Sequence, residues 1–367
     1  MYYKLYWRWE RNIRNICSHG GIYSVDPSLV KVDFSSNVNP LGISTLALDA
    51  IQKDAFSLSS RYPDTECGAL RKSLSDYLGN ELDVEWICVG NGATELIHRF
   101  AQTFVRNKVL IPFPTFCEYE IASERTGANT VFVPLTTLSL DPDTIMDKAK
   151  NSDAIFLCNP NNPTGLICNT KLIEKIVESV DSSTKILVDE SYIELSDYSP
   201  GMQTMINRTK EFENLIVLRS MTKSFGLAGL RIGYIICHPK LIKRLSSNQI
   251  AWNVNGFAQA AGIASLKDLN YLKQSRILIQ KERSFMQEMI KKRTNTFIPH
   301  MSDVNYFLIY LENKSSIELR DSILARKGVL VRDCSTFMGM GVKYVRVAVK
   351  THHENLSLLD ALESVDN

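Results

Sequence analysis

The residues best suited to chemistry surround Lys223, in the segment RSMTKSFGLAGLRIGY at residues 219–234. Hydroxyls stand beside the lysine at Ser220 and Thr222, and Arg231 follows eight residues after it. Hydroxyl groups and a guanidinium fork together suit a phosphate dianion. A lysine amine beside such a phosphate site can condense with the aldehyde of a cofactor. Because a lone lysine after a strand is usually a solvated surface residue, this prediction depends on its neighbours.

Three further motifs carry polar groups in similar places. GNGAT at residues 90–94 stands between a predicted strand and a predicted helix, where free backbone N–H groups and the helix dipole favour a phosphate. NPNNPTG at residues 159–165 follows another strand and by itself marks only a turn. Asp189, in DESY at residues 189–192, follows the apolar run 186–188, and a carboxylate at a buried strand end is costly unless it is paired. An ordinary glycine turn and a helix-capping aspartate are the alternatives for the first and third motifs.

The elements that must position these motifs alternate in type. Short β-type runs are predicted at residues 87–89, 109–111, 130–134, 154–158, 185–188, 215–218 and 232–237, with helical patterns from about residue 93, at 115–124 and at 171–180. This alternation favours a mostly parallel sheet covered by helices on both faces. Ligands of such sheets bind at the carboxyl ends of the strands, which is where all four motifs lie.

Length and the later pattern predict two domains, because 367 residues exceed one compact core. Residues 239–281 are helical in pattern and include the connection out of the large domain. Strand-like residues 305–311 and 344–349, around a helical stretch at 317–327, indicate a small α+β domain. We expect an N-terminal arm and part of the small domain at residues 1–45, the large domain at 46–250, and the connecting helix and C-terminal small domain at 251–367.

Composition is that of an ordinary globular protein, with 44% hydrophobic residues, 22% charged residues and a net charge of +2. No block of like charge indicates a nucleic-acid surface. The eight cysteines are scattered without zinc-like spacing, which favours buried reduced thiols over a disulfide framework. Residues 1–16 lack the apolar core of a signal peptide, and no apolar run approaches the ~20 residues that span a bilayer. We therefore expect a cytoplasmic protein without a metal, nucleic-acid or membrane partner.

In order and spacing, these motifs resemble the aminotransferase family of fold-type I pyridoxal 5′-phosphate enzymes. The resemblance runs from about residue 37 to residue 346. It implies an α/β fold, with a mostly parallel seven-stranded sheet between helices in the large domain and a small α+β domain beside it. It also implies that Lys223 carries the cofactor as an internal Schiff base.

The resemblance further assigns roles residue by residue. Lys223, Asp189 and Tyr192 would be catalytic, with Asp189 on the pyridinium nitrogen and Tyr192 sharing the cofactor's phenolic oxygen with Asn162. Phe116 would stack on the cofactor ring, although a core phenylalanine is nearly as good an interpretation. The other implied cofactor-binding residues are Gly92, Ala93, Thr94, Ser220, Thr222, Arg231 and Tyr62, the last reaching the cofactor phosphate of the neighbouring subunit in a homodimer.

Two groups within the family share most of these motifs: the histidinol-phosphate aminotransferases and the threonine-phosphate decarboxylases of cobalamin biosynthesis. HGG at residues 19–21, DFSSNVNPLG at 33–42, RSMTK at 219–223, VRDCSTF at 331–337 and RVAVKT at 346–351 are similar to the decarboxylases. That similarity implies that His19, Asn37, Asn162 and Arg332 help to hold the substrate, with His19 and Arg332 near its phosphate, and that Arg346 binds its α-carboxylate. Surface positions for His19 and Arg332 are the alternatives.

Two residues depart from the usual decarboxylase pattern, which often has Asn where Ile22 stands and an acidic residue where Ala93 stands. The expected reaction is the decarboxylation of L-threonine O-3-phosphate to (R)-1-amino-2-propanol O-2-phosphate and CO2. A histidinol-phosphate or related aminotransferase is the first alternative. A non-catalytic regulator with the same fold is a remote one.

Overall fold

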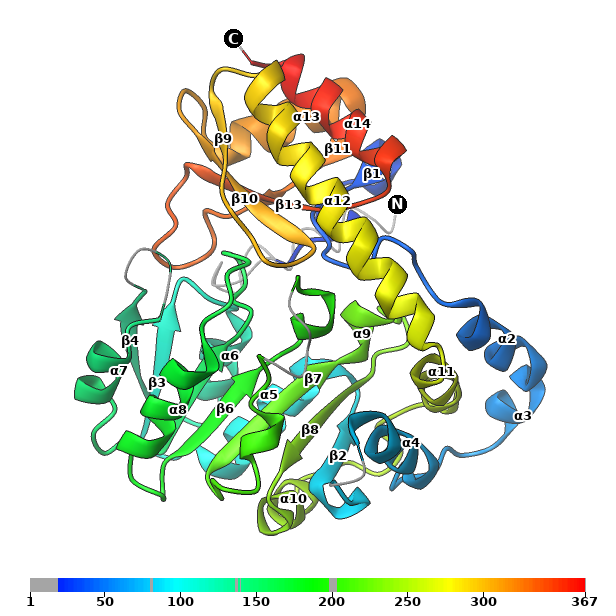
Figure 1. Ribbon diagram of the computed structural model, residues 1–367, viewed down its shortest axis with the longest axis vertical. Coiled ribbons are helices and arrows are strands. Elements are labelled where there is room, and N and C mark those ends of the chain that lie inside the picture. The colour runs from blue at the N-terminus through cyan, green and yellow to red at the C-terminus, as the bar shows by residue number, and fades with distance from the viewer. Residues whose placement is uncertain (1–18, 80–81, 136–137, 139, 198–202, 367) are drawn as a thin grey trace, which may run out of the picture.

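The computed structural model describes residues 19–79, 82–135, 138, 140–197 and 203–366. The predicted arm at residues 1–16 and Cys17 lie outside these ranges. The described chain forms a large sheet and a small sheet, which helix α12 (Leu269–Arg293) joins along one side (Figure 1).

The large sheet has seven strands and carries the polar motifs. Its order is β2 (Ile87–Gly90), β8 (Gly233–Cys237), β7 (Leu215–Ser220), β6 (Lys185–Asp189), β5 (Ala154–Cys158), β3 (Lys108–Phe113) and β4 (Asn129–Pro134). The neighbours from β7 to β4 run parallel, and only β8 runs antiparallel to the strands beside it. This confirms the predicted mostly parallel sheet of seven strands.

Helices cover both faces of this sheet, which explains why its strands are apolar almost throughout. Along β6, Ile186 and Val188 face one apolar cluster while Leu187 faces the other. The first cluster includes α4 (Gly68–Leu78), α8 (Thr170–Ser179), α11 (Gly256–Leu266) and the start of α12, and the second includes α5 (Gly92–Phe104), α6 (Glu118–Glu124) and α10 (Pro239–Ser246). Four further helices lie on this side of the molecule: α2 (Thr45–Lys53), α3 (Ala55–Ser60), α7 (Pro142–Lys148) and α9 (Met221–Ser224).

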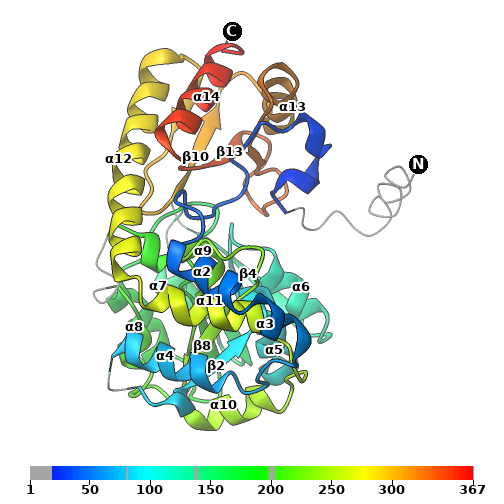
Figure 2. The ribbon, with the colours of Figure 1, turned by 90° about the vertical axis from the view of Figure 1, so that its right-hand side faces the viewer.

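The small sheet is antiparallel, in the order β12 (Arg332–Asp333), β13 (Tyr344–Ala348), β10 (Tyr306–Leu311) and β9 (Phe297–Pro299). A parallel pair, β1 (Val32–Asp33) with β11 (Val329–Leu330), brings the N-terminal segment to this side of the molecule. Helices α13 (Ser316–Lys327) and α14 (His352–Glu363) pack here with the end of α12 (Figure 2). The domain boundaries expected at residues 45 and 250 stay predictions.

Two details differ from the sequence-based expectation. The single helical pattern at residues 239–281 is three helices, α10, α11 and α12, separated at 247–255 and 267–268. The described cysteines are free thiols except Cys117, which is disulfide-bonded. Cys117 is only partly buried, unlike most of the free thiols, which lie in the core. In the described part of the chain, no helix has the length and apolar character needed to cross a membrane.

Candidate active site

A cavity of about 310 Å³ lies where the carboxyl ends of β5, β6 and β7 face the small sheet. Most side chains singled out from the sequence line it: His19, Asn37, Ala93, Thr94, Phe116, Asn162, Asp189, Tyr192, Ser220, Thr222, Lys223, Arg231, Arg332 and Arg346. They come from both sheets and from the segment that precedes α2. The fold therefore gathers them at the strand ends, as expected for a doubly covered parallel sheet.

The N-terminus of α5 contributes a site for a phosphate. No side chain caps this helix, so the N–H groups of its first turn can bind an anion. Arg231 lies against the same turn: a Cβ on Gly92 would stand 2.6 Å from Nη2 of Arg231, and Gly92 has φ +83°. Glycine is therefore required where helix and guanidinium meet. Ser220 and Thr222, whose hydroxyl oxygens lie 2.5 Å apart, also line the cavity.

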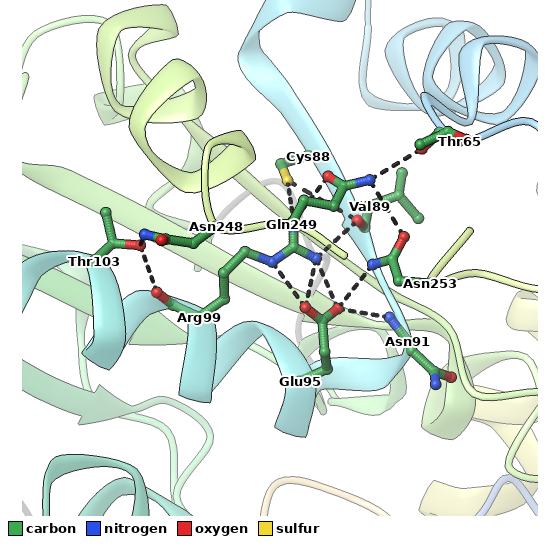
Figure 3. A network of polar contacts seen from close by, with 10 residues as sticks. All are labelled: Thr65, Cys88, Val89, Asn91, Glu95, Arg99, Thr103, Asn248, Gln249 and Asn253. Carbon is green, nitrogen blue, oxygen red and sulfur yellow. Dashed lines mark hydrogen bonds and ion pairs between the residues drawn. The ribbon is translucent and has the colours of Figure 1, made fainter. Parts of the chain in front are cut away.

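A polar network around the buried side chain of Arg99 holds α5 in place (Figure 3). Arg99 Nη2 lies 2.7 Å from a carboxylate oxygen of Glu95, and Glu95 also accepts the backbone N–H of Asn91 at 2.9 Å. Gln249 accepts from Arg99 at 3.0 Å, and Asn253 donates to Glu95 at 3.1 Å. The network thus ties the phosphate-binding end of α5 to the loop between α10 and α11.

Lys223 lies on α9, the single turn of helix that follows β7. The amide of Asn39 donates to the Ser224 carbonyl at 2.8 Å, and the backbone N–H of Asn39 donates to the carbonyl of Lys223 at 3.2 Å. The turn that carries the lysine is therefore fixed by the N-terminal segment. Burial, aided by the charges of Arg346 and Arg231, lowers the pKa of Lys223 to about 8. Near neutral pH a sizeable fraction of the amine is therefore uncharged, which is the nucleophilic form.

Asp189 ends β6 with both carboxylate oxygens hydrogen-bonded. Oδ1 accepts the backbone N–H of Ser191 at 2.9 Å and its hydroxyl at 2.5 Å, and Oδ2 accepts the hydroxyl of Tyr119 at 2.8 Å. Burial raises the pKa of Asp189, whereas these hydrogen bonds lower it by stabilising the carboxylate. The protonated pyridine nitrogen of the expected cofactor would supply the positive partner that a buried carboxylate needs.

Asn162 and Tyr192 lie close to a third group, Arg346. The guanidinium donates through Nη1 to Oδ1 of Asn162 and through Nη2 to the Ser35 carbonyl at 2.9 Å. Because the amide oxygen of Asn162 is engaged, its NH2 group is left to donate elsewhere. Burial raises the pKa of Tyr192 to about 12, so its hydroxyl also keeps its proton near neutral pH. The two side chains therefore offer donors suited to a phenolic oxygen.

Asn37 gives independent evidence that the cavity suits a polar ligand. The residue is 1% exposed, and its side-chain amide lies near the Tyr192 hydroxyl without a hydrogen bond of ordinary geometry. Leaving a buried polar group unpaired costs about 1–3 kcal/mol. A ligand that pairs with this amide would recover that free energy.

Two arginines of the small sheet face the cavity together. In the antiparallel pairing of β12 with β13, Arg332 is directly opposite Arg346. Opposed residues project from the same face of a sheet, and both guanidiniums line the cavity. Arg332 donates to the Thr336 hydroxyl at 3.0 Å. Burial, reinforced by the charge of Arg346, lowers the pKa of Arg332 to about 10.

The cavity is therefore strongly cationic. Its lining includes four basic side chains, Lys223, Arg231, Arg332 and Arg346, and a single carboxylate, that of Asp189. Such an arrangement favours the binding of anionic ligands. The described residues contain no group of three or more His, Cys, Asp or Glu placed to hold a metal ion.

His19 reaches the cavity because of the glycines that follow it. A Cβ on Gly20 would lie 2.5 Å from the Ser35 carbonyl, and the N–H of Gly21 donates to the Ser35 hydroxyl at 2.7 Å. Glycine at position 20 therefore allows this close approach of the two backbone segments. It places the His19 ring 6.0 Å, centroid to centroid, from the ring of Phe116.

Tyr62 is the one predicted site residue that lies away from this cavity. It is 80% exposed, and its ring stacks on Trp252 with 4.5 Å between centroids. In this geometry, Tyr62 therefore does not line the cavity of its own chain. The predicted role across a subunit interface stays a prediction.

Sequence reasoning passed over several residues that support the site. Tyr119 and Ser191 hydrogen-bond Asp189, and Glu118 contacts His19. Phe337 also lines the cavity. Tyr119 and Glu118 follow Phe116 closely in the chain, and that proximity is the only signal that would have pointed to them.

Comparison with known proteins places this geometry in context. The model of the family "Aminotransferase class I and II" matches residues 30–362. A protein of Caldanaerobacter subterraneus subsp. tengcongensis, named provisionally as a threonine-phosphate decarboxylase, is 35% identical over 354 residues, 95% of this chain and 93% of that protein. Histidinol-phosphate aminotransferase 2 of Archaeoglobus fulgidus is 33% identical over 348 residues, 94% of this chain and 96% of that protein.

A solved structure agrees with the sequence comparisons. The crystal structure of the histidinol-phosphate aminotransferase from Clostridium acetobutylicum has a TM-score of 0.84 and 34% identity, and the match covers 91% of this chain and 98% of that one. Relatives with different reaction names thus resemble this chain to nearly the same degree.

Proposed function

Because this chain belongs to the class I and II aminotransferase family, with pyridoxal 5′-phosphate as its cofactor, we propose that it decarboxylates L-threonine O-3-phosphate. The products are (R)-1-amino-2-propanol O-2-phosphate and CO2, a step in cobalamin biosynthesis. One observation carries the proposal: Arg332 and Arg346 stand opposite each other over the cavity. Threonine phosphate has a carboxylate and a phosphate only a few bonds apart, which suits two adjacent guanidiniums. Histidinol phosphate has only one anionic group.

The residues present fit the cofactor. The first turn of α5, with Gly92, Ala93 and Thr94, would bind its phosphate together with Arg231, Ser220 and Thr222. Asp189 would hold the proton on the ring nitrogen, and Phe116 would cover one face of the ring. When bound, pyridoxal phosphate accepts the electron pair left at Cα of an amino acid as a bond there breaks.

The chain's own side chains decide which bond that is. Arg346 binds the substrate carboxylate, and Arg332 with His19 binds its phosphate, while Asn37 pairs with the polar atoms between them. Fixing both anions would fix the rotation about Cα and so select the bond that breaks. Lys223, with its pKa lowered to about 8, can return a proton to Cα after CO2 has left.

A histidinol-phosphate aminotransferase is the second candidate. It is favoured by the 33% identity and 94% coverage of the Archaeoglobus relative and by the close fold of the Clostridium structure. The same residues would then select the Cα–H bond rather than the bond to the carboxylate, with Lys223 moving the proton.

Incubation of the cofactor-loaded enzyme with threonine phosphate tests the proposal. We expect CO2 release with no keto acid present, and a loss of at least about 100-fold in rate in Lys223→Ala. Conversion of the cofactor to its amine form by histidinol phosphate, reversed by 2-oxoglutarate, would contradict the proposal and establish the second candidate.

The proposed assembly is a cytoplasmic homodimer in which Tyr62 completes the partner's cavity. Phe56, Tyr62, Ile250 and Trp252 support this assembly, because they are large apolar side chains exposed in the single chain. Apolar surface of this kind commonly marks a subunit interface.

A further inference from the structure

Glu118 joins two histidines at the edge of the active-site cavity. Its side chain belongs to the first turn of α6, and the residue is only 7% exposed. Nε2 of His19 donates to Oε1 at 2.9 Å, and Nε2 of His98, from α5, donates to Oε2 at 2.9 Å. One carboxylate therefore links α5, which packs on the large sheet, with the N-terminal segment.

The contact with His98 fixes the carboxylate, and the carboxylate in turn orients His19. Hydrogen bonds from His19 and His98, in that order, lower the pKa of Glu118 to about 2, so it is ionised at neutral pH and acts only as an acceptor. Nε2 of each ring must then carry a proton. Glu118 therefore holds the Nε2 side of the His19 ring, and His19 lines the cavity with Arg332.

His19 needs such a support more than the other cavity residues do. Its side chain is 57% exposed, and it lies in a segment outside the large sheet, held beside Ser35 by Gly20 and Gly21. A side chain this exposed loses rotamer freedom when it binds a ligand. An anchor that fixes the ring beforehand reduces that loss.

We propose that Glu118 is a positioning residue for substrate phosphate, acting by holding the His19 imidazole in place at the edge of the cavity that Arg332 also lines. The inference rests on the proposed function only in that the substrate carries a phosphate, which threonine phosphate and histidinol phosphate share. Glu118 does not touch the substrate itself.

The test is a double-mutant cycle on Glu118→Gln and His19→Asn, read by competition with inorganic phosphate and by steady-state kinetics. Each single variant should raise the inhibition constant of inorganic phosphate and the KM of the phosphorylated substrate about tenfold, as expected for one charge-assisted hydrogen bond. Because Glu118 acts through His19, the double variant should be no weaker than His19→Asn alone. kcat should change by less than the KM.

Two controls separate this role from a structural one. Glu124→Gln, at an exposed site on the same helix, should leave both constants unchanged. The cofactor absorbance band should be the same in all variants, which reports a folded, loaded site. Additive effects of Glu118→Gln and His19→Asn, or an unchanged phosphate constant in Glu118→Gln, would overturn the inference. Absence of CO2 release by the wild type would overturn the proposed function alone, because phosphate competition is read independently with either phosphorylated substrate.

Discussion

At the scale of single residues, the site works by setting the charge of two buried groups in opposite ways. Burial and two neighbouring arginines push Lys223 toward its neutral form, whereas hydrogen bonds from Ser191 and Tyr119 help to keep Asp189 ionised against burial. A neutral amine can attack an aldehyde, and an ionised carboxylate can hold a proton on a ring nitrogen. Both states are therefore present at the same pH.

Tyr119 provides a test of this balance. Tyr119→Phe keeps the stacking on Phe156, at 4.9 Å between centroids, but removes the donor to Oδ2 of Asp189. Loss of that hydrogen bond destabilises the carboxylate, so the pKa of Asp189 rises further. Because a hydrogen bond that lowers the pKa of Asp189 is removed, Asp189 becomes protonated at a higher pH as the solution is acidified. The activity that requires ionised Asp189 should therefore be lost at a higher pH than in the wild type.

We expect the acidic limb of the kcat profile to move up by about one pH unit, the equivalent of ~1.4 kcal/mol. The measurement is kcat against pH at saturating substrate. Tyr310→Phe, on the small sheet away from the cavity, serves as the control and should leave the profile in place. A limb that stays put or moves to lower pH in Tyr119→Phe would show that Tyr119 does not support the carboxylate.

Some of the residues that surround the cavity could be predicted from the sequence, and others could not. Lys223 and Asp189 were accessible because each follows an apolar strand, where a polar side chain is conspicuous. The segment with Asn162 by itself marked only a turn, and the role of Asn162 came from the family resemblance. Tyr119 and Glu118 act through other side chains, and nothing in their local pattern distinguishes them from helix residues that merely pack. His19 was accessible through the resemblance of residues 19–21 to the decarboxylases, and the contact of Gly20 with Ser35 requires a residue without a Cβ.

At the scale of elements, the joint between α5 and Arg231 determines whether a phosphate site exists. Gly92→Ala would put a methyl group 2.6 Å from the guanidinium and place alanine at φ +83°. Arg231 must then move away from the helix terminus. We expect the affinity for pyridoxal phosphate to fall at least about tenfold, as expected for a lost charge-assisted contact.

A matched control isolates the contact from the backbone strain. Gly127 also has a positive φ, +77°, but nothing lies within 4 Å of a Cβ built there. Gly127→Ala should therefore cost only about 1–2 kcal/mol of stability and leave cofactor affinity unchanged. Titration of the apoprotein with the cofactor, followed by absorbance, compares the two. Equal affinities in both variants would remove Gly92 from the phosphate site.

Strands were predicted better than helices because of how each is buried. The seven strands of the large sheet lie between two layers of helices, so nearly every residue is apolar and the runs stand out. The break between α10 and α11 was missed, since residues 247–255 contain polar residues that a helix surface also tolerates. The two-residue strands β11 and β12 were not found, because a pair of residues has no period to detect.

At the scale of the whole molecule, the position of Tyr62 and its proposed role in the partner's cavity imply that one chain is not a complete enzyme. Its ring is exposed and stacked on Trp252, away from its own cavity. If Tyr62 serves the partner subunit, Lys223→Ala and Tyr62→Ala chains complement each other in mixed dimers, since one of the two cavities then has both residues.

Random mixing of the two inactive variants should restore about a quarter of the wild-type activity, because about half of the dimers are mixed and each has one intact cavity. The measurement is activity after the chains are unfolded together and refolded, compared with each variant refolded alone. Failure to recover activity while dimers form would place Tyr62 outside the partner's site.

The cavity draws its two kinds of ligand contact from two separately built sheets. Groups suited to the cofactor stand on the large sheet, while Arg332 and Arg346 stand on the small one. Substitutions in the small sheet can therefore redirect which substrate bond is exposed while leaving the inherited cofactor site intact. Such a division of labour lets descendants of one ancestor diverge in reaction while staying alike along most of their length, as the decarboxylase and aminotransferase relatives of this chain do.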